Sequence, residues 1–366
     1  MFKKRKFQLL GLAALMTVLG SVVISCGDDT AATQSYTGPG SEFGIVLNGD
    51  GTFVVTKKSS IGGTTTLTVN GTYSRLSTGF VKLTVTSSDP VDQVPAGETA
   101  YGLEIPGLAF LLKPAGSDAN IIPMVVSGDC PTADMSMNWI QVETDDSQIA
   151  TSTSSDYYGT FTYTHSTTSA SLPAKYNLVN TTSLGSSSIG TLTCSAGTAT
   201  VSGADMFLTG QGGAIVHTNT SSTSADGMIV AMPNGTLTTT TALEGSYSGL
   251  VFDKAQTSSG SNANRIFPVS VTLTASTSTT ITGVATKFSD VETLPTVASD
   301  ATLSLTSVDS PSAGFIRGTI TIASSTTNLV CMAKTDVVGS GKNMLFCIGQ
   351  SPNSSTKHFN ILLVSR

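Results

Sequence analysis

The sequence contains little charge of either sign. Lys, Arg, Asp and Glu make up 11% of its 366 residues, whereas globular proteins average about 25%. Acidic residues outnumber basic ones, so the formal net charge is −6. A nucleic-acid-binding protein needs clustered Lys and Arg to neutralise phosphates, and electrostatic contact with anionic lipid needs them too. We therefore expect no nucleic-acid partner and no electrostatic attachment to a membrane.

Histidine is also scarce. The chain has three histidines, His165, His217 and His358, and none has a carboxylate or a cysteine at metal-ligand spacing. The Gly-x-Ser-x-Gly motif that marks the nucleophile of many serine hydrolases is missing. We expect no metal, no cofactor and no catalytic residue, so the chain is not predicted to be an enzyme. A Ser-His-Asp triad can be assembled from distant positions, which keeps an envelope hydrolase as the least favoured alternative.

The N-terminus has the pattern of a secretory signal. Basic residues at 3–6 precede an apolar run from Phe7 to Ile24, which ends at Ser25-Cys26. The last four residues of this region, Val23 to Cys26, resemble the lipobox of bacterial lipoproteins. That resemblance implies a signal peptide at 1–25, cleavage before Cys26 by signal peptidase II, and a diacylglycerol on the Cys26 sulfur. An uncleaved transmembrane helix is the alternative, because the run is just long enough to span a bilayer.

The residues after Cys26 bear on its location. Gly27 stands where enterobacterial lipoproteins retained at the inner membrane carry aspartate, so the resemblance favours the outer membrane, at its periplasmic face or at the cell surface. We expect residues 26–34 to form a flexible tether. Loss of residues 1–25 removes four basic residues and no acidic one, which changes the formal net charge to −10. Membrane attachment is therefore expected through lipid alone, and two or more acyl chains make it stable.

Four cysteines remain once Cys26 carries the lipid. An even number in an exported chain predicts disulfides. Cys331 and Cys347 flank the turn-rich segment 338–343, so we predict a bridge across a hairpin there. That pairing leaves Cys130 with Cys194. A zinc site is the competing interpretation, although the sequence has no Cys-x-x-Cys pair and no nearby histidine to complete a ligand set.

The body of the chain is predicted to be all-β. Apolar and hydroxyl residues alternate over 269–274, 302–306 and 319–322, as in half-buried strands. Residues 48–51, Asn-Gly-Asp-Gly, read as a hairpin turn, and Asn70-Gly71 is interpreted as a second turn. Closely spaced strands with turn signals predict antiparallel meanders, in barrels or sandwiches. We expect Trp139, the only tryptophan, in a core.

Two β domains are predicted. The first covers 35–145, a polar linker covers 144–155, and the larger second region covers 156–366, with a sub-boundary near 240. Paired apolar runs recur along the chain, and the strand-like segments 138–142 and 360–364 follow the first and the last pair. We interpret both segments as strands that close a sheet at the end of a domain. The alternative is that hairpins of similar composition look alike by chance.

Two further resemblances concern the body. The segment Gly245-Ser246-Tyr247 is similar to the first strand of lipocalin-like barrels, although it lacks the tryptophan common there. The segments 79–85, 101–107 and Cys130-Pro131 resemble uncharacterised envelope lipoproteins of predatory Gram-negative bacteria, a resemblance that assigns no residue a role.

The combined expectation is a lipid-anchored envelope protein that acts as a non-catalytic module for binding, adhesion or surface structure. Its partners would be the membrane, through the lipid, and an envelope protein, a glycan or an apolar ligand. The alternative is a periplasmic lipocalin-like carrier, which would need a barrel interior too large for its own side chains to fill.

Overall fold

Two closed eight-stranded antiparallel barrels and a nine-stranded sheet make up the computed structural model. It describes residues 32–38, 43–59, 63–113, 122–143, 157–178, 184–195, 198–201, 204–208, 214–217, 227–237, 239–253, 265–296, 299–350 and 358–366. Helix within these ranges is limited to three 3-10 turns, at His165–Thr167, Thr240–Leu243 and Val337–Gly339. The predicted all-β class with antiparallel meander barrels is confirmed. No helix in the described ranges is long and apolar enough to cross a membrane.

The first barrel, barrel 1, is a simple meander. Its strands are β1 (Gln34–Thr37), β2 (Phe43–Leu47), β3 (Thr52–Lys58), β4 (Thr65–Arg75), β5 (Phe80–Asp89), β6 (Thr99–Ile105), β7 (Ala109–Lys113) and β8 (Ile122–Val126). Each strand pairs with the next, and β8 closes on β1 through the pair Tyr36 and Val126. The predicted turn at 48–51 is confirmed, because the Asn48 N–H donates to the Thr52 carbonyl oxygen at 2.8 Å between β2 and β3.

The second predicted turn is wrong. Asn70 and Gly71 lie inside β4, where a register shift between them marks a bulge against β5. Gly71 is needed there for a reason other than chain reversal: a Cβ at this position would collide with the ring of Phe53 and with the Thr84 carbonyl oxygen. Glycine inside a strand often marks such a close approach.

The nine-stranded sheet follows barrel 1. Its strands, in chain order, are β9 (Met135–Glu143), β10 (Tyr157–Thr164), β11 (Ser169–Asn177), β12 (Ser187–Thr191), β13 (Thr193–Ser195), β14 (Thr198–Val201), β15 (Ala204–Leu208), β16 (Ala214–His217) and β17 (Gly227–Pro233). In space their order is β12-β11-β10-β9-β17-β16-β15-β14-β13.

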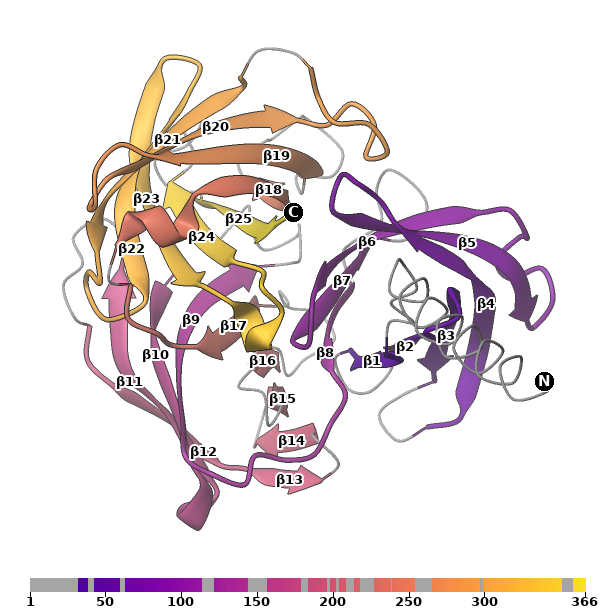
Figure 1. Cartoon of the computed structure of the whole chain (residues 1–366). Helices are drawn as coiled ribbons and strands as arrows, with labels where there is room; N and C mark the ends of the chain where they lie inside the picture. The colour runs from indigo at the N-terminus through magenta and orange to yellow at the C-terminus, as the bar shows by residue number, and fades with distance from the viewer. Residues whose placement is uncertain are drawn as a thin grey trace, which may run out of the picture.

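This sheet curls until its two edges meet. The edge strands β12 and β13 are consecutive in the chain and are separated only by Leu192, and β12 also contacts β14. Figure 1 shows β12, β13 and β14 together at one end of the molecule. Inside the curl, Trp139, Phe161 and Tyr163 pack with Leu192 and other apolar side chains. The expected core position of Trp139 is confirmed by its 1% exposure.

The second barrel, barrel 2, ends the chain (Figure 1). Its strands are β18 (Gly245–Asp253), β19 (Arg265–Ala275), β20 (Ile281–Lys287), β21 (Ala301–Val308), β22 (Phe315–Ile322), β23 (Ser325–Lys334), β24 (Met344–Gln350) and β25 (His358–Ser365). The alternating segments 269–274, 302–306 and 319–322 fall in β19, β21 and β22, so those strand predictions are confirmed. β25 closes the barrel on β18.

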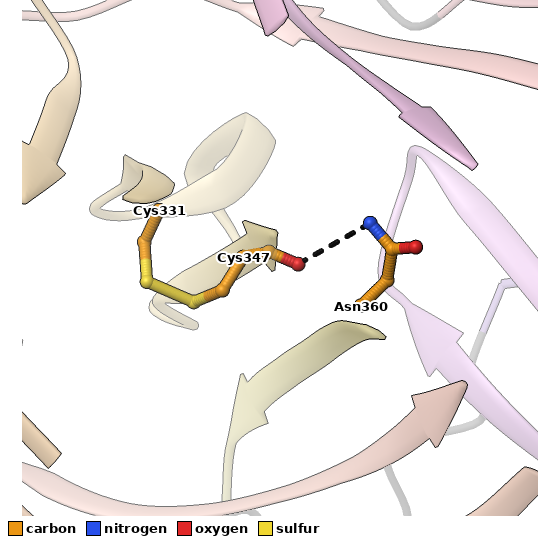
Figure 2. Close-up of a disulfide and its surroundings, with 3 residues drawn as sticks. All are labelled: Cys331, Cys347 and Asn360. Atoms are coloured by element: carbon orange, nitrogen blue, oxygen red, sulfur yellow. Dashed lines mark hydrogen bonds between the residues drawn. A yellow bond between two sulfur atoms is a disulfide. The ribbon is translucent and has the colours of Figure 1, made fainter. Parts of the chain in front are cut away.

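A disulfide joins two neighbouring strands of barrel 2 on their interior side. Cys331 on β23 and Cys347 on β24 are opposite each other in register, and their sulfurs are bonded. Both cysteines are fully buried among the interior side chains. Figure 2 shows the bridge together with Asn360 of β25, whose side-chain NH₂ donates to the Cys347 carbonyl oxygen at 3.5 Å. The bridge therefore ties two adjacent strands beside the strand that closes the barrel.

One large apolar core joins the three parts. It is formed by outward-facing side chains of both barrels and one face of the curled sheet, and we call it the shared core. Barrel 1 contributes Phe80 and Leu103, the sheet contributes Tyr158, and barrel 2 contributes Phe315 and Phe346, each at most 3% exposed. Strands that face this core are buried on both sides, as all of Met344–Ile348 in β24 are.

The strand pairing divides the chain differently from the predicted ranges 35–145 and 156–366. Barrel 1 ends at Val126, and β9 belongs to the curled sheet, between β10 and β17. The predicted linker at 144–155 joins β9 and β10, which pair with each other. The segment 360–364 lies in a barrel-closing strand as interpreted, whereas 138–142 lies in mid-sheet, so that interpretation is wrong for β9. Barrel 2 begins at Gly245, near the sub-boundary expected around 240.

Truncating a side chain of the shared core should destabilise the whole protein. We expect Phe346→Ala to lower the free energy of unfolding by about 3–5 kcal/mol, the usual cost of removing a buried phenylalanine ring. Val284→Ala is the control, because Val284 is 48% exposed on β20 and should change stability by less than about 0.5 kcal/mol. Urea unfolding followed by tryptophan fluorescence measures both, and equal effects of the two variants would contradict the shared core.

Candidate functional site

A cavity of about 590 Å³ lies where barrel 1 meets the segment that leads into the curled sheet. Small-molecule sites usually fall within about 300–1,000 Å³ and often lie between domains. The cavity is lined by Gln34 at the start of β1, Gly107 in the turn between β6 and β7, residues 126–133, and Met135 of β9. We call this the junction cavity, and it is the candidate binding site.

Hydrogen bonds and a disulfide hold the wall of the junction cavity. The Val126 N–H donates to the Leu108 carbonyl oxygen at 2.8 Å, and the Ser127 N–H donates to the Ser35 carbonyl oxygen at 2.7 Å. The hydroxyls of Thr37 and Ser127 are 2.6 Å apart, and Cys130 is disulfide-bonded. A wall held at several points is largely formed before any ligand arrives, which reduces the entropic cost of binding.

The junction cavity also borders barrel 2. Gly107 has φ +68°, in the left-handed region that favours glycine. A Cβ at Gly107 would be 3.4 Å from Cγ1 of Val338, which lies in the 3-10 turn between β23 and β24. The three parts of the molecule therefore meet around this cavity, and its shape depends on how they are held together.

A buried polar network occupies the same end of barrel 1. Glu104, 8% exposed, accepts hydrogen bonds from Arg75 Nε (2.9 Å), Arg75 Nη2 (3.1 Å) and the Tyr36 hydroxyl (2.8 Å). Burial, and then the nearby Glu104 carboxylate, raise the pKa of Tyr36 well above its usual value of 10. The buried carboxylate is thus fully partnered, as burial of a charge requires. We assign this network a structural role beside the cavity.

Direct contacts fix barrel 1 against barrel 2. Glu292, in the loop between β20 and β21, accepts hydrogen bonds from Lys82 (2.6 Å) and from the Tyr101 hydroxyl (2.8 Å). Both hydrogen bonds lower the pKa of Glu292, and the bond from Lys82 has the larger effect. The Thr78 hydroxyl donates to the Val291 carbonyl oxygen, and the Ser248 hydroxyl donates to that of Thr78. The geometry around the junction cavity is therefore kept by polar contacts in addition to the shared core.

Barrel 2 also has an uncharged outer face away from the shared core. Neighbouring positions across β19 to β23 carry Thr274, Thr282, Ser304, Thr319 and Asn328, which follow one another in register. All five are exposed or partly exposed. We call this row the hydroxyl face, and it is a second surface that a partner can reach.

The predicted site residues are placed as follows. Cys26 lies outside the described residues, as does the side chain of Cys194, so the pairing of Cys194 with Cys130 stays a prediction. His165 is exposed in a 3-10 turn, and its backbone N–H donates to Asp134 Oδ1; the side chains of His217 and His358 lie outside the described part. No group of three or more His, Cys, Asp or Glu side chains that could hold a metal occurs among the described residues.

No sequence motif points to the junction cavity. Its wall is mostly a short irregular segment, and only the Cys130-Pro131 pair within it was singled out. A cavity of this kind depends on how distant elements meet, which no local spacing of residues encodes.

No protein-family model matches the chain, and no curated protein matches it. Among solved structures, the isotype 1 transferrin binding protein B of serogroup B Neisseria meningitidis is similar at 9% identity and a TM-score of 0.28. A double mutant of transferrin binding protein B from Haemophilus parasuis Hp5 is similar at 8% identity and a TM-score of 0.27. Each similarity covers 88% of this chain and 65% of the other, so the chain spans less than two thirds of their length. These scores carry over no residue role, ligand or activity.

Two Tyr→Phe variants should have opposite effects on stability. Tyr36→Phe removes a hydrogen bond to a buried carboxylate and should lower the free energy of unfolding by about 1.5–3 kcal/mol. Tyr158 is fully buried and its hydroxyl has no hydrogen-bond partner among the described residues, so Tyr158→Phe should raise the free energy of unfolding by about 1 kcal/mol. Urea titration of both variants is the measurement, and a clear loss of stability in Tyr158→Phe would show that this hydroxyl is bonded.

Proposed function

We propose that the chain is a lipid-anchored protein of the bacterial cell envelope that acts as a non-catalytic binding module. The junction cavity carries this proposal, because a preformed cavity of ligand size lies where three parts are packed into one body.

Attachment through Cys26 would place the junction cavity near the membrane. Gln34, which lines the cavity, follows Cys26 by eight positions. A fully extended chain spans at most about 3.3–3.6 Å per residue, so Gln34 can be no more than about 26–29 Å from the lipidated cysteine. The cavity would therefore meet partners that are themselves at the membrane surface.

The carrier alternative receives less support from the barrels. A lipocalin-like carrier needs space inside its barrel. In barrel 2 the inward positions of the strands are filled by mutually packed side chains such as Val271, Leu305 and Ile361. In barrel 1 they are filled by Tyr36, Phe110 and others. The segment from Gly245 is the first strand of an eight-stranded barrel, as the similar segment is in lipocalins. The interior of barrel 2, however, is a packed core.

Cell fractionation tests the anchor. We expect the wild-type chain in the outer-membrane fraction and Cys26→Ala in the soluble fraction, because the variant lacks the sulfur that takes the lipid. Mass spectrometry of the mature N-terminus should show an acylated cysteine in the wild type. Ser25→Ala is the matched control, since a small residue is kept before the cleavage site. Recovery of unmodified wild-type protein from the soluble fraction would refute the proposal.

Protease treatment of intact cells then decides which face of the outer membrane carries the protein. Loss of the mature protein, with a periplasmic control intact, would place the body outside the cell and favour adhesion or a surface layer through the hydroxyl face. Full protection would place it in the periplasm and favour an envelope partner or ligand there.

A further inference from the structure

We propose that the junction cavity binds a cationic side chain, that of lysine or arginine in a peptide, and that Asp129 is the residue that pairs with it. This rests on the binding role proposed above and adds the chemical class of the ligand.

Most described aspartates already serve the fold. They accept hydrogen bonds from backbone N–H groups and so shape turns and loops, at Asp50, Asp134, Asp290, Asp300, Asp309 and Asp336. Each of these carboxylates has its ligand in the chain itself, in keeping with the preference of aspartate for turns.

Asp129, with Asp89 and Asp92, lies outside this group of turn-forming aspartates, and of the three it is the one that lines the junction cavity. Asp129 is exposed and makes no hydrogen bond or ion pair with any residue of the described part of the chain. It lies between Gly128 and Cys130, and the disulfide of Cys130 restrains the backbone next to Asp129. A carboxylate placed in a cavity without an internal partner is available to a ligand.

The other residues that line the cavity favour a cationic group attached to an apolar chain. None of the described lining residues is basic, and Asp129 is the only charged residue among them. Hydroxyls at Ser127 and Thr132 and the Gln34 amide supply neutral hydrogen-bonding atoms. Val126, Pro131 and Met135 supply apolar surface. Lysine and arginine combine a charged end with a chain of methylene groups, and such side chains bury the stem while the charge finds a partner.

The size of the cavity favours a side chain that belongs to a peptide. A volume of about 590 Å³ lies in the middle of the range for small-ligand sites, which leaves room for backbone beside the side chain. An anionic ligand is disfavoured, because the described lining residues carry one negative charge and the formal net charge of the full chain is −6.

Calorimetric titration of the full mature protein, in detergent, tests the proposal. The probes are Nα-acetyl-lysine methylamide, the same compound with norleucine in place of lysine, and free lysine. We expect the lysine amide to bind at least about tenfold more tightly than the norleucine amide, the scale of one charge-assisted hydrogen bond. Free lysine should bind more weakly than the amide, because it lacks the peptide groups; equal binding would show that the ligand is the free amino acid and overturn the peptide assignment.

Two variants make the test specific. Asp129→Asn should remove the preference for lysine over norleucine while keeping the shape of the cavity. Asp92→Asn is the matched control: Asp92 is exposed in the loop between β5 and β6, at the opposite end of barrel 1, and its φ of 66° is one that asparagine adopts readily. Unchanged unfolding in urea shows that both variants fold.

Equal binding of the lysine and norleucine amides, or a preference that survives in Asp129→Asn, would overturn the inference. So would the absence of binding by any probe. Those results would leave the lipid anchor and the location of the protein untouched, because fractionation and protease treatment test them independently.

Discussion

The shared core is the constraint on which the rest of the structure depends. Two barrels that each fill their own interior also turn an apolar outer face toward the curled sheet and toward each other. Strands such as β24 are therefore buried on both sides, and their sequence is continuously apolar over Met344–Ile348. Because these faces cover one another, the three parts behave as one body, and a cavity at their meeting point can keep a defined shape.

Two charged side chains near this core, Glu104 and Glu292, have hydrogen-bond partners within the chain. Where a charge is buried, as at Glu104, it has several donors; where the barrels touch, Glu292 accepts from both Lys82 and Tyr101. Most described aspartates bond to nearby backbone N–H groups. Two-sided burial leaves few positions in strands such as β24 where a free charge is tolerated, and the hydroxyl face of barrel 2 carries hydroxyl and amide groups in place of charges.

Sequence patterns predicted the elements better than their assembly. β19, β21 and β22 were predictable because one side of each faces solvent, which produces clean alternation. Asn70-Gly71 was misread because glycine serves there as space for Phe53, and a packing need looks the same as a turn in sequence. The division of the chain was missed because β9 pairs with β17, far along the chain. The junction cavity was invisible for the same reason, since Gln34, Gly107 and Asp129 meet only in the folded molecule.

The edge strands β12 and β13 lie next to each other on either side of Leu192, and this affects how copies of the protein can interact. Open sheet edges invite strands from other molecules and so promote aggregation. Both barrels are closed, and the two edges of the curled sheet lie next to each other, joined by one buried residue. A protein tethered in a membrane is confined to two dimensions and collides with its own copies far more often than one free in solution. If the chain is tethered as proposed, this arrangement would leave neighbouring copies little open strand edge to pair with, so that dense packing on a membrane would not favour edge-to-edge association.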